Sequence, residues 1–133
     1  MAGSITQTLL PVGSITNTHP NNEEITLLWV GDAADGTIPT LLIDQYAGWY
    51  IARAATVPGA VASGGVVPTD QYDITAIDPD GIDLFDGALM NRSSTVPQAE
   101  PMSALIPFGG ITITFAGQAV HSATGKLKIY LVR

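Results

Sequence analysis

The sequence predicts an all-β protein: a single-domain β-sandwich of jelly-roll type with an N-terminal extended arm. Three observations predict this fold class. Apolar and polar residues alternate with a period of two, turn-forming residues separate these runs, and 133 residues is the length of one ordinary domain. We expect roughly seven to nine strands, as in jelly rolls. Residues 1–22 are predicted to form the arm or a ribbon, and residues 23–133 the sandwich.

Five segments have the composition and periodicity of strands. Residues 111–115, Ile-Thr-Ile-Thr-Phe, alternate most clearly, as a strand with one buried face does. Residues 72–77 and 126–131 alternate in the same way. Two further segments are more continuously apolar, and they predict more deeply buried strands at 25–30 and 49–57.

Turn-forming residues lie between these runs, mostly as Gly beside Asp, Pro or a second Gly. Two longer segments interrupt the short rhythm of strand and turn. Residues 58–68 are small, Gly-rich and uncharged, and they predict a long loop. Residues 91–107 contain three prolines and predict a second loop or an edge segment. Residues 40–47 have mild helical character, and we interpret them as a short turn or an irregular strand.

The N-terminal residues contain a short repeat. Residues 3–8 read Gly-Ser-Ile-Thr-Gln-Thr, and residues 13–18 read Gly-Ser-Ile-Thr-Asn-Thr. Two Thr-rich strands of this kind form either a ribbon or an arm that lies along a neighbouring subunit. The sequence leaves both alternatives open.

Charge is scarce in this chain and unevenly placed along it. Charged residues are 13% of the sequence, below the roughly 25% of an average soluble domain, and the net charge is −7. Residues 1–86 hold eleven acids and one base, Arg53, whereas residues 87–133 hold one acid and four bases. The two blocks either mix on folding or form complementary patches for self-association. Low charge with 46% apolar residues is typical of a surface that a partner partly covers.

Composition excludes several classes of protein. The absence of Cys excludes a disulfide-stapled mini-protein and a Cys-based zinc module. The acidic balance argues against a nucleic-acid partner, because phosphate binding needs clustered Lys and Arg. No apolar run approaches the roughly 20 residues of a membrane span, and no signal-peptide pattern opens the chain. We therefore expect neither a nucleic-acid nor a membrane partner.

A run of six aspartates between residues 70 and 86 is a candidate calcium site, with Asp78, Asp80 and Asp83 as its ligands. The spacing does not match the helix-loop-helix calcium pattern. With Asp78 at position 1, the glycine falls at position 4 and Leu89 stands where the bidentate Glu belongs. The alternative is that Asp-Pro-Asp-Gly forms a turn between strands, while the other aspartates cap turns and hydrate the surface.

Catalytic and sugar-binding motifs are weak. His19 and His121 are the only histidines, and neither belongs to a recognisable triad or nucleophile elbow. We therefore predict that the chain is not an enzyme. Trp49-Tyr50 is either a sugar-stacking platform or part of the packing between two sheets, and we favour the packing.

An ordered set of motifs runs through the second part of the chain. Val57-Pro58-Gly59 is followed by Pro68-Thr69-Asp70-Gln71-Tyr72-Asp73-Ile74-Thr75, then by Asp78, Gly81-Ile82-Asp83-Leu84, Gly87 and Asn91-Arg92-Ser93. A Gly-Gly strand at 109–115 and a Lys-Leu-Lys-Ile-Tyr-Leu strand at 126–131 complete the set. In order and spacing, this pattern resembles that of small virion proteins of tailed bacteriophages, over residues 48–133.

The resemblance implies a non-enzymatic structural protein of the virion: a head decoration or cement protein on the capsid surface, made in the cytoplasm of the host bacterium. Its implied partners are the major capsid protein and further copies of itself, with a homo-trimer favoured over a dimer. No cofactor is expected. One alternative is a head–tail connector, a tail protein or a head-fibre component. A second alternative, from another class, is a carbohydrate- or calcium-binding β-sandwich module.

Contacts with neighbouring subunits are predicted in three places: the N-terminal segment, the 58–68 loop and the 91–107 segment. The residues predicted to make these contacts are Ile5, Leu9, Leu10, Val61, Val66, Val67, Arg92 and Met102.

Overall fold

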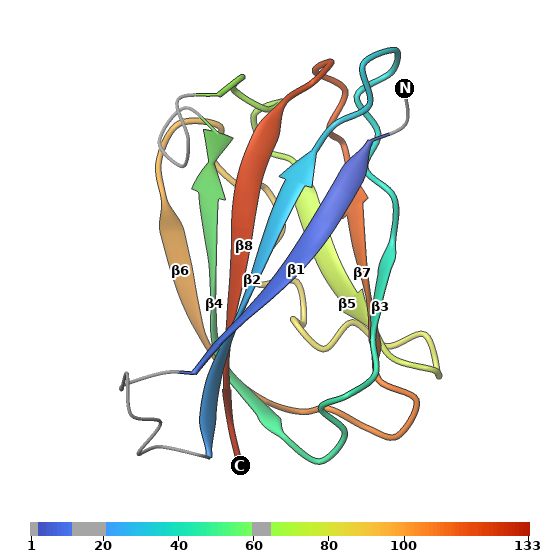
Figure 1. Ribbon diagram of the computed structural model, residues 1–133, viewed down its shortest axis with the longest axis vertical. Helices are drawn as coiled ribbons and strands as arrows, with labels where there is room; N and C mark the ends of the chain where they lie inside the picture. Colours follow the sequence, from blue (N-terminus) through green and yellow to red (C-terminus); the bar gives the residue numbers. More distant parts are fainter. Residues whose placement is uncertain (1–2, 12–20, 60–64) are drawn as a thin grey trace.

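The computed structural model of the chain describes residues 3–11, 21–59 and 65–133, and for residues 7–11 it describes the backbone alone. Within these residues the chain forms two antiparallel sheets and almost no helix (Figure 1). The predicted all-β class is therefore confirmed. Eight strands make up the two sheets: β1 (Ser4–Pro11), β2 (Asn22–Val30), β3 (Leu41–Ile43), β4 (Tyr50–Pro58), β5 (Asp73–Ile77), β6 (Gln98–Leu105), β7 (Ile111–Ala116) and β8 (Thr124–Val132).

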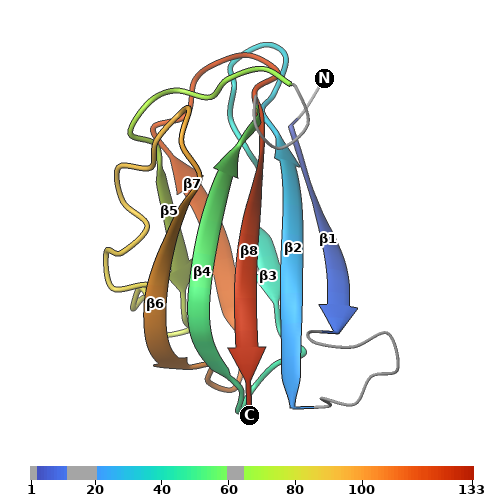
Figure 2. The same cartoon turned by 90° about the vertical axis from the view of Figure 1, so that its left-hand side faces the viewer.

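The two sheets pack face to face. The large sheet has the order β1-β2-β8-β4-β6, and the small sheet has the order β3-β7-β5. Figure 2 shows the large sheet in front of the small one, so that one side of each sheet faces the interior and the other faces outward. All strand pairs are antiparallel, although few of the neighbours in either sheet are neighbours in the chain.

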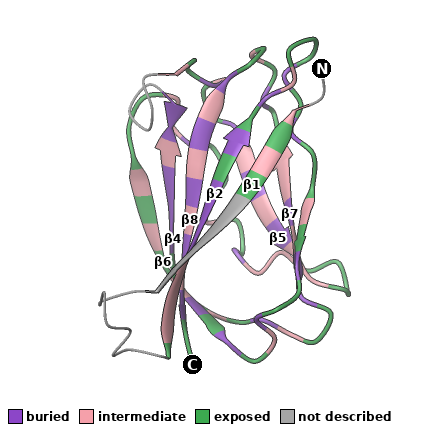
Figure 3. Ribbon diagram, in the orientation of Figure 1, coloured by how far each residue is buried: buried purple, intermediate pink, exposed green. Residues whose placement is uncertain are grey.

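Alternation along the strands creates the core between the sheets. In β8, Leu127, Ile129 and Leu131 are buried, whereas the residues between them are only half-buried. Toward one end of the core, the ring of Trp29 on β2 lies 5.7 Å from that of Tyr72 and 5.4 Å from that of Phe115, so the aromatic rings join the two sheets. Figure 3 shows this alternation of buried and half-buried residues along β8.

The five strands predicted from periodicity are all present, as β2, β4, β5, β7 and β8. The 91–107 segment contains β6, which lies at an edge of the large sheet. Of the two predicted alternatives, a loop or a segment at a sheet edge, the second is therefore correct for residues 98–105. Residues 40–47 contain the short strand β3 followed by a turn. The loop predicted at 58–68 is described only in part, because residues 60–64 lie outside the described ranges.

The N-terminal segment forms the other edge of the large sheet. β1 pairs with β2 along its whole length, from Ser4 opposite Val30 to Pro11 opposite Glu23. Ile5 packs against the core. The second copy of the repeat, at 13–18, lies outside the described residues, so the choice between a ribbon and an arm that reaches a neighbour stays a prediction.

Residues 83–92 run alongside β5 without forming a regular strand. The amide of Leu84 donates to the carbonyl of Ala76 (2.8 Å), and the amide of Ile74 donates to the carbonyl of Leu89 (3.0 Å). At the last residue of this stretch, the amide of Arg92 donates to the carbonyl of Tyr72 at 2.7 Å. We call residues 83–92 the edge segment, since it covers the edge of the small sheet beside β5.

Candidate functional site

The acidic run is built into the turn that follows β5. One carboxylate oxygen of Asp78 accepts hydrogen bonds from the amides of Asp80 and Ile82, both at 2.9 Å. The amide of Gly81 donates to the carbonyl of Asp78 at 3.0 Å, and Gly81 has φ of 83°. The predicted Asp-Pro-Asp-Gly turn is therefore confirmed, and the Asp78 side chain stabilises it.

Asp83 fastens the edge segment to β5. Its Oδ1 accepts hydrogen bonds from the amides of Ala76 and Phe85, both at 3.0 Å, and its Oδ2 accepts one from the amide of Gly87 at 3.1 Å. Within the described residues, no group of three or more His, Asp or Glu side chains is placed to hold a metal ion. The calcium site at Asp78, Asp80 and Asp83 stays a prediction, and the geometry adds no support to it.

Asp70 and Asp73 hold the end of the edge segment and the residues that follow it. The carboxylate of Asp73 accepts a hydrogen bond from the amide of Asn91 (2.8 Å), and that of Asp70 accepts one from the amide of Ser94 (3.1 Å). Among the described residues, the carboxylates of Asp80 and Asp86 have no hydrogen-bond partner, and both side chains are exposed. Most of the run is thus structural, and Asp80 and Asp86 supply negative charge to the surface.

Arg92, one of the predicted contact residues, lies between the two sheets. Its side chain is 3% exposed. The guanidinium donates to the hydroxyl of Thr56 on β4 (2.9 Å), to the carbonyl of Ala88 (3.0 Å) and to the carboxylate of Glu100 on β6 (3.1 Å). The arginine therefore joins the edge segment to two strands of the large sheet, and its contacts in this structure lie within the chain.

Gln118 also joins distant segments, and no pattern in the sequence singles it out. It is buried, and its side-chain amide nitrogen donates to the carbonyls of Gly36 (2.5 Å) and Val120 (3.1 Å). Its side-chain oxygen accepts a hydrogen bond from the amide of Thr69 at 3.1 Å. A lone Gln in a loop carries no pattern, because its partners come from two loops distant in the sequence.

The other predicted contact residues fall into three groups. Val66 and Val67 are exposed, at 46% and 38%, in the described part of their loop. Ile5 and Met102 are partly buried and pack against the core. The side chains of the rest lie outside the described residues: Leu9, Leu10 and Val61.

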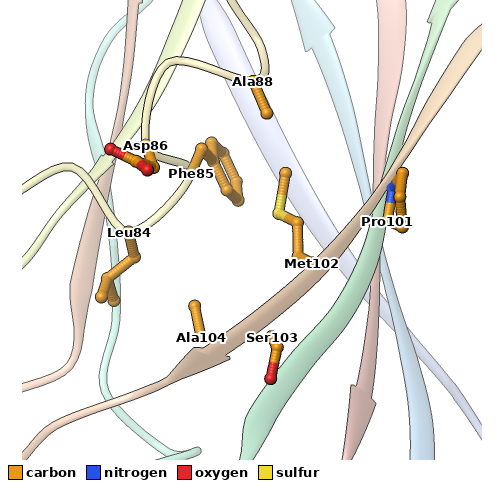
Figure 4. Close-up of a pocket in the computed structure, with 8 residues that line it drawn as sticks. All are labelled: Leu84, Phe85, Asp86, Ala88, Pro101, Met102, Ser103 and Ala104. Atoms are coloured by element: carbon orange, nitrogen blue, oxygen red, sulfur yellow. The ribbon is translucent and has the colours of Figure 1, made fainter.

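Met102 lines an open cavity of about 300 Å³ at the edge of the sandwich. The cavity lies between the edge segment and β6, where Figure 4 shows Met102 pointing toward Phe85. Its lining residues are Leu84, Phe85, Asp86, Ala88, Pro101, Met102, Ser103 and Ala104. The walls carry no cluster of polar side chains that would orient a ligand.

The outward side of the large sheet carries most of the positive charge. Lys126 and Lys128 on β8 point outward, and a β-bulge between Ile51 and Arg53 turns the Arg53 side chain to the same side. Glu24 is the one acid of this side among the described residues, and it pairs with Lys128 at 3.4 Å. We call Arg53, Lys126 and Lys128, with the neighbouring apolar residues Leu28 and Val57, the basic face.

A cluster of exposed residues lies at the lower end of the small sheet. Phe108, in the loop between β6 and β7, is 92% exposed, and Ile82 is 58% exposed. The turn after β5 lies beside the loop before β7, since a Cβ on Gly109 would stand 2.8 Å from the ring of Pro79 (Figure 1). Asp44, which follows β3, borders the same loop at Gly110. We call Asp44, Pro79, Asp80, Ile82 and Phe108 the acidic tip.

The candidate sugar platform is only half exposed. Trp49 is 9% exposed, and the guanidinium of Arg133 lies 4.7 Å from its ring, so the indole belongs to the packing of the sandwich. Tyr50 points outward at 45% exposure. Tyr46 packs edge-on against Trp49, and burial together with the carboxylate of Glu23 raises the pKa of Tyr46. His121 is exposed, and His19 lies outside the described residues.

Comparison with known proteins assigns this chain to no family. No protein-family model and no curated protein matches this chain. A solved structure, the cyanophage Pam1 capsid asymmetric unit, aligns with 98% of this chain and 84% of that chain, at 15% identity and a TM-score of 0.35. A likeness this weak carries no argument about function. In the part of the chain that the structure describes, there is no helix long and apolar enough to cross a membrane.

Proposed function

We propose that this chain is a non-enzymatic structural protein of a tailed-phage virion, a head decoration or cement protein that binds and stabilises the assembled capsid. The observation that carries the proposal is the motif set, which resembles that of small phage virion proteins and whose residues have a structural role in the fold. Asp73, Asp78, Asp83 and Arg92 all belong to this set, and all four hold the edge segment and its flanking turns in place.

The structural use of these motif residues bears on the kind of function. Their carboxylates accept hydrogen bonds from backbone amides, and the guanidinium of Arg92 is buried. A resemblance carried by such residues argues for a shared scaffold and not for shared chemistry at a site. It supports a protein that acts through its outward surfaces, as a decoration protein does, and it supports the proposal that the chain has no catalytic activity.

We also propose that the sandwich is a jelly roll. In that fold, eight strands pair as a folded ribbon: the first with the eighth, the second with the seventh, the third with the sixth and the fourth with the fifth. If β2 is counted as the first strand, β2 pairs with β8, β3 with β7 and β4 with β6. The edge segment, which lies along β5, stands in the place of the missing fifth strand. β1 is then an addition at the edge of the large sheet.

The proposed partners are the major capsid protein and further copies of this chain, at the outer surface of the capsid. A homo-trimer is favoured because capsid lattices offer threefold positions, with a dimer second. A protein that binds only the assembled shell stabilises that shell by mass action. Weak contacts repeated over the lattice then add up to large avidity. Exposed apolar residues such as Val67 and Phe108 are the kind of surface that such contacts cover.

The test uses particles of the phage that encodes the chain. Quantitative mass spectrometry of purified particles should find this protein in numbers comparable to those of the major capsid protein. Particles that lack it should bind the purified chain during sedimentation, and binding should raise the temperature at which the shells come apart. Absence from the particles, or no binding to the shells, would refute the proposal. A copy number sufficient for a single ring would instead support a head–tail connector.

A further inference from the structure

Positive and negative charge are separated onto different sides of this molecule. Three of the five Lys and Arg residues lie on the basic face, while Arg92 is buried and Arg133 lies over Trp49. All nine aspartates of the chain lie outside the strands of the large sheet, in β5 or in loops. Folding brings Arg53, from the acidic block of the sequence, beside Lys126 and Lys128 on the basic face, and it places the exposed Asp44 and Asp80 on the acidic tip. These two surfaces of one chain carry opposite charge.

The basic face has the composition of an interface. The strand register puts Lys126 between Leu28 on β2 and Val57 on β4, so an apolar side chain flanks the ammonium on either side. Leu28 is 43% exposed. Among the described residues, Lys126 has no acidic partner, whereas Lys128 forms an ion pair with Glu24. An unpaired lysine between apolar residues suits a partner that brings both an apolar anchor and a carboxylate.

The acidic tip offers both of these groups. Phe108 is the most exposed large apolar residue of the described chain, and its loop is held by a hydrogen bond from the amide of Gly110 to the carbonyl of Pro107 at 3.1 Å. Asp44 lies beside this loop at Gly110. Asp80 follows Pro79, which lies beside the loop at Gly109, and both aspartates are exposed. An aromatic ring on a hydrogen-bonded turn is a suitable anchor, because little side-chain entropy is lost when it is buried.

We propose that the acidic tip of one copy of this chain binds the basic face of a second copy. Phe108 packs between Leu28 and Val57 with its ring against the ammonium of Lys126, as cation–π contacts require. Asp44 and Asp80 then face Lys128 and Arg53. The commitment to a second copy rests on charge complementarity, since the chain itself carries both an acidic surface with an exposed aromatic ring and a basic face with apolar neighbours.

The tip and the face lie on different sides of the sandwich, at the lower end of the small sheet and on the outward side of the large sheet (Figure 2). The contact is therefore head-to-tail, and each copy uses its tip for one neighbour and its face for another. Such contacts close into rings or extend as chains. The contact does not require a capsid, so this inference stands or falls separately from the proposed virion function.

The experiment is a charge exchange between the two surfaces, followed by sedimentation velocity. One variant carries Lys126→Glu and Lys128→Glu, and the other carries Asp44→Lys and Asp80→Lys. The wild-type chain should associate with rising concentration at about 20 mM salt, and much less at about 500 mM, where screening is strong. Each variant alone should be monomeric, because its tip and face then repel each other. An equimolar mixture should associate again, since each tip meets a face of opposite charge.

Two further variants complete the test. Phe108→Ser should weaken association about tenfold or more, as the loss of an aromatic anchor does. The control, Ala33→Lys with Ala34→Lys, adds positive charge in an exposed loop at the other end and should associate like the wild type. All of these positions are at least partly exposed, so thermal unfolding should confirm that every variant is folded. A wild-type chain that stays monomeric in low salt, or variants whose mixture does not associate, would overturn the proposal.

Discussion

The Nη1 atom of Arg92 lies 3.1 Å from the Oε2 atom of Glu100, in a partly buried ion pair that joins the edge segment to β6. The same guanidinium donates through Nε to the hydroxyl of Thr56 on β4. Charges removed from water are stabilised only when partners surround them, so this arginine depends on groups from the large sheet and from the edge segment. The pair closes one side of the sandwich with polar contacts, beside the open cavity that Met102 lines.

Replacing Arg92 with Ala should lower the free energy of unfolding by about 3 kcal/mol, because Thr56 and Glu100 lose their donor and the interior gains a void. Glu100 is 34% exposed and regains some water, which keeps the loss from being larger. The matched control is Arg53→Ala on the basic face, with an expected cost below about 1 kcal/mol. Urea denaturation measures both, and equal losses would show that Arg92 does not join the sheets.

Replacing Asp83 with Ala should lower the free energy of unfolding by about 2 to 3 kcal/mol, because three backbone amides lose their acceptor. Asp80→Ala is the control, since its exposed carboxylate accepts no hydrogen bond among the described residues, and its cost should stay below about 0.5 kcal/mol. Thermal unfolding with and without calcium separates the two interpretations of this segment. A calcium-dependent rise in melting temperature that both variants abolish would support the metal site instead.

Periodicity predicted the strands that have one apolar face and missed those that do not. In β7 and β8 every inward residue is apolar or Gly, so alternation is visible in the sequence. In β6 the side chains on the inner side include Gln98 and Glu100, which serve Ser93 and Arg92, so no hydrophobic pattern marks this strand. Polar residues become interior ones only when distant segments supply their partners.

The regular alternation of inward and outward side chains also fails at one residue of the basic face. Ile51 and Arg53 are two residues apart and would share a face in a regular strand. The bulge between them adds one residue to β4, so Ile51 faces the core while Arg53 faces outward. No pattern in the sequence marks this bulge. The block distribution of charge was visible in the sequence, but which charged residues share a surface depends on the order of strands in the sheets.

Stability should fall at high pH because of buried tyrosine. Burial raises the pKa of Tyr72 from 10.0 to about 12, and the charge of Arg92 offsets part of this effect. The neutral phenol is therefore favoured in the folded state. Its stabilising contribution is complete below pH 10 and is lost as the pH rises toward 12, since the unfolded chain releases the proton first. Tyr46, whose pKa is also raised, should add to the effect.

Tyr72→Phe should remove part of this pH dependence. Denaturation of the wild type at a series of alkaline pH values should show a decline of at most about 2 to 3 kcal/mol from this residue. The variant should decline less over the same range, with the remainder due to Tyr46. Near-ultraviolet absorbance of tyrosinate gives an independent titration. Identical pH profiles for the wild type and Tyr72→Phe would contradict the assignment.

Two glycines with nearly the same backbone conformation should respond very differently to Ala. Gly87 and Gly110 have φ of 77° and 75°, so a side chain is strained at both, by about 1 kcal/mol. At Gly87 an added Cβ meets nothing within 4 Å, whereas at Gly110 it would stand 2.2 Å from the carbonyl oxygen of Ile43. Gly110→Ala must therefore push β3 away from the loop that carries Phe108, at a cost of roughly 3 kcal/mol or more.

Thermal unfolding of Gly87→Ala and Gly110→Ala should show a much larger loss of stability for the second variant. Because the displaced loop also presents Phe108, Gly110→Ala should weaken the salt-dependent self-association at temperatures where it is still folded. Gly87→Ala should associate like the wild type. Similar melting temperatures for the two variants would mean that the approach of Gly110 to Ile43 is looser than the structure describes, and the acidic tip would then be less firmly held than the docking of Phe108 requires.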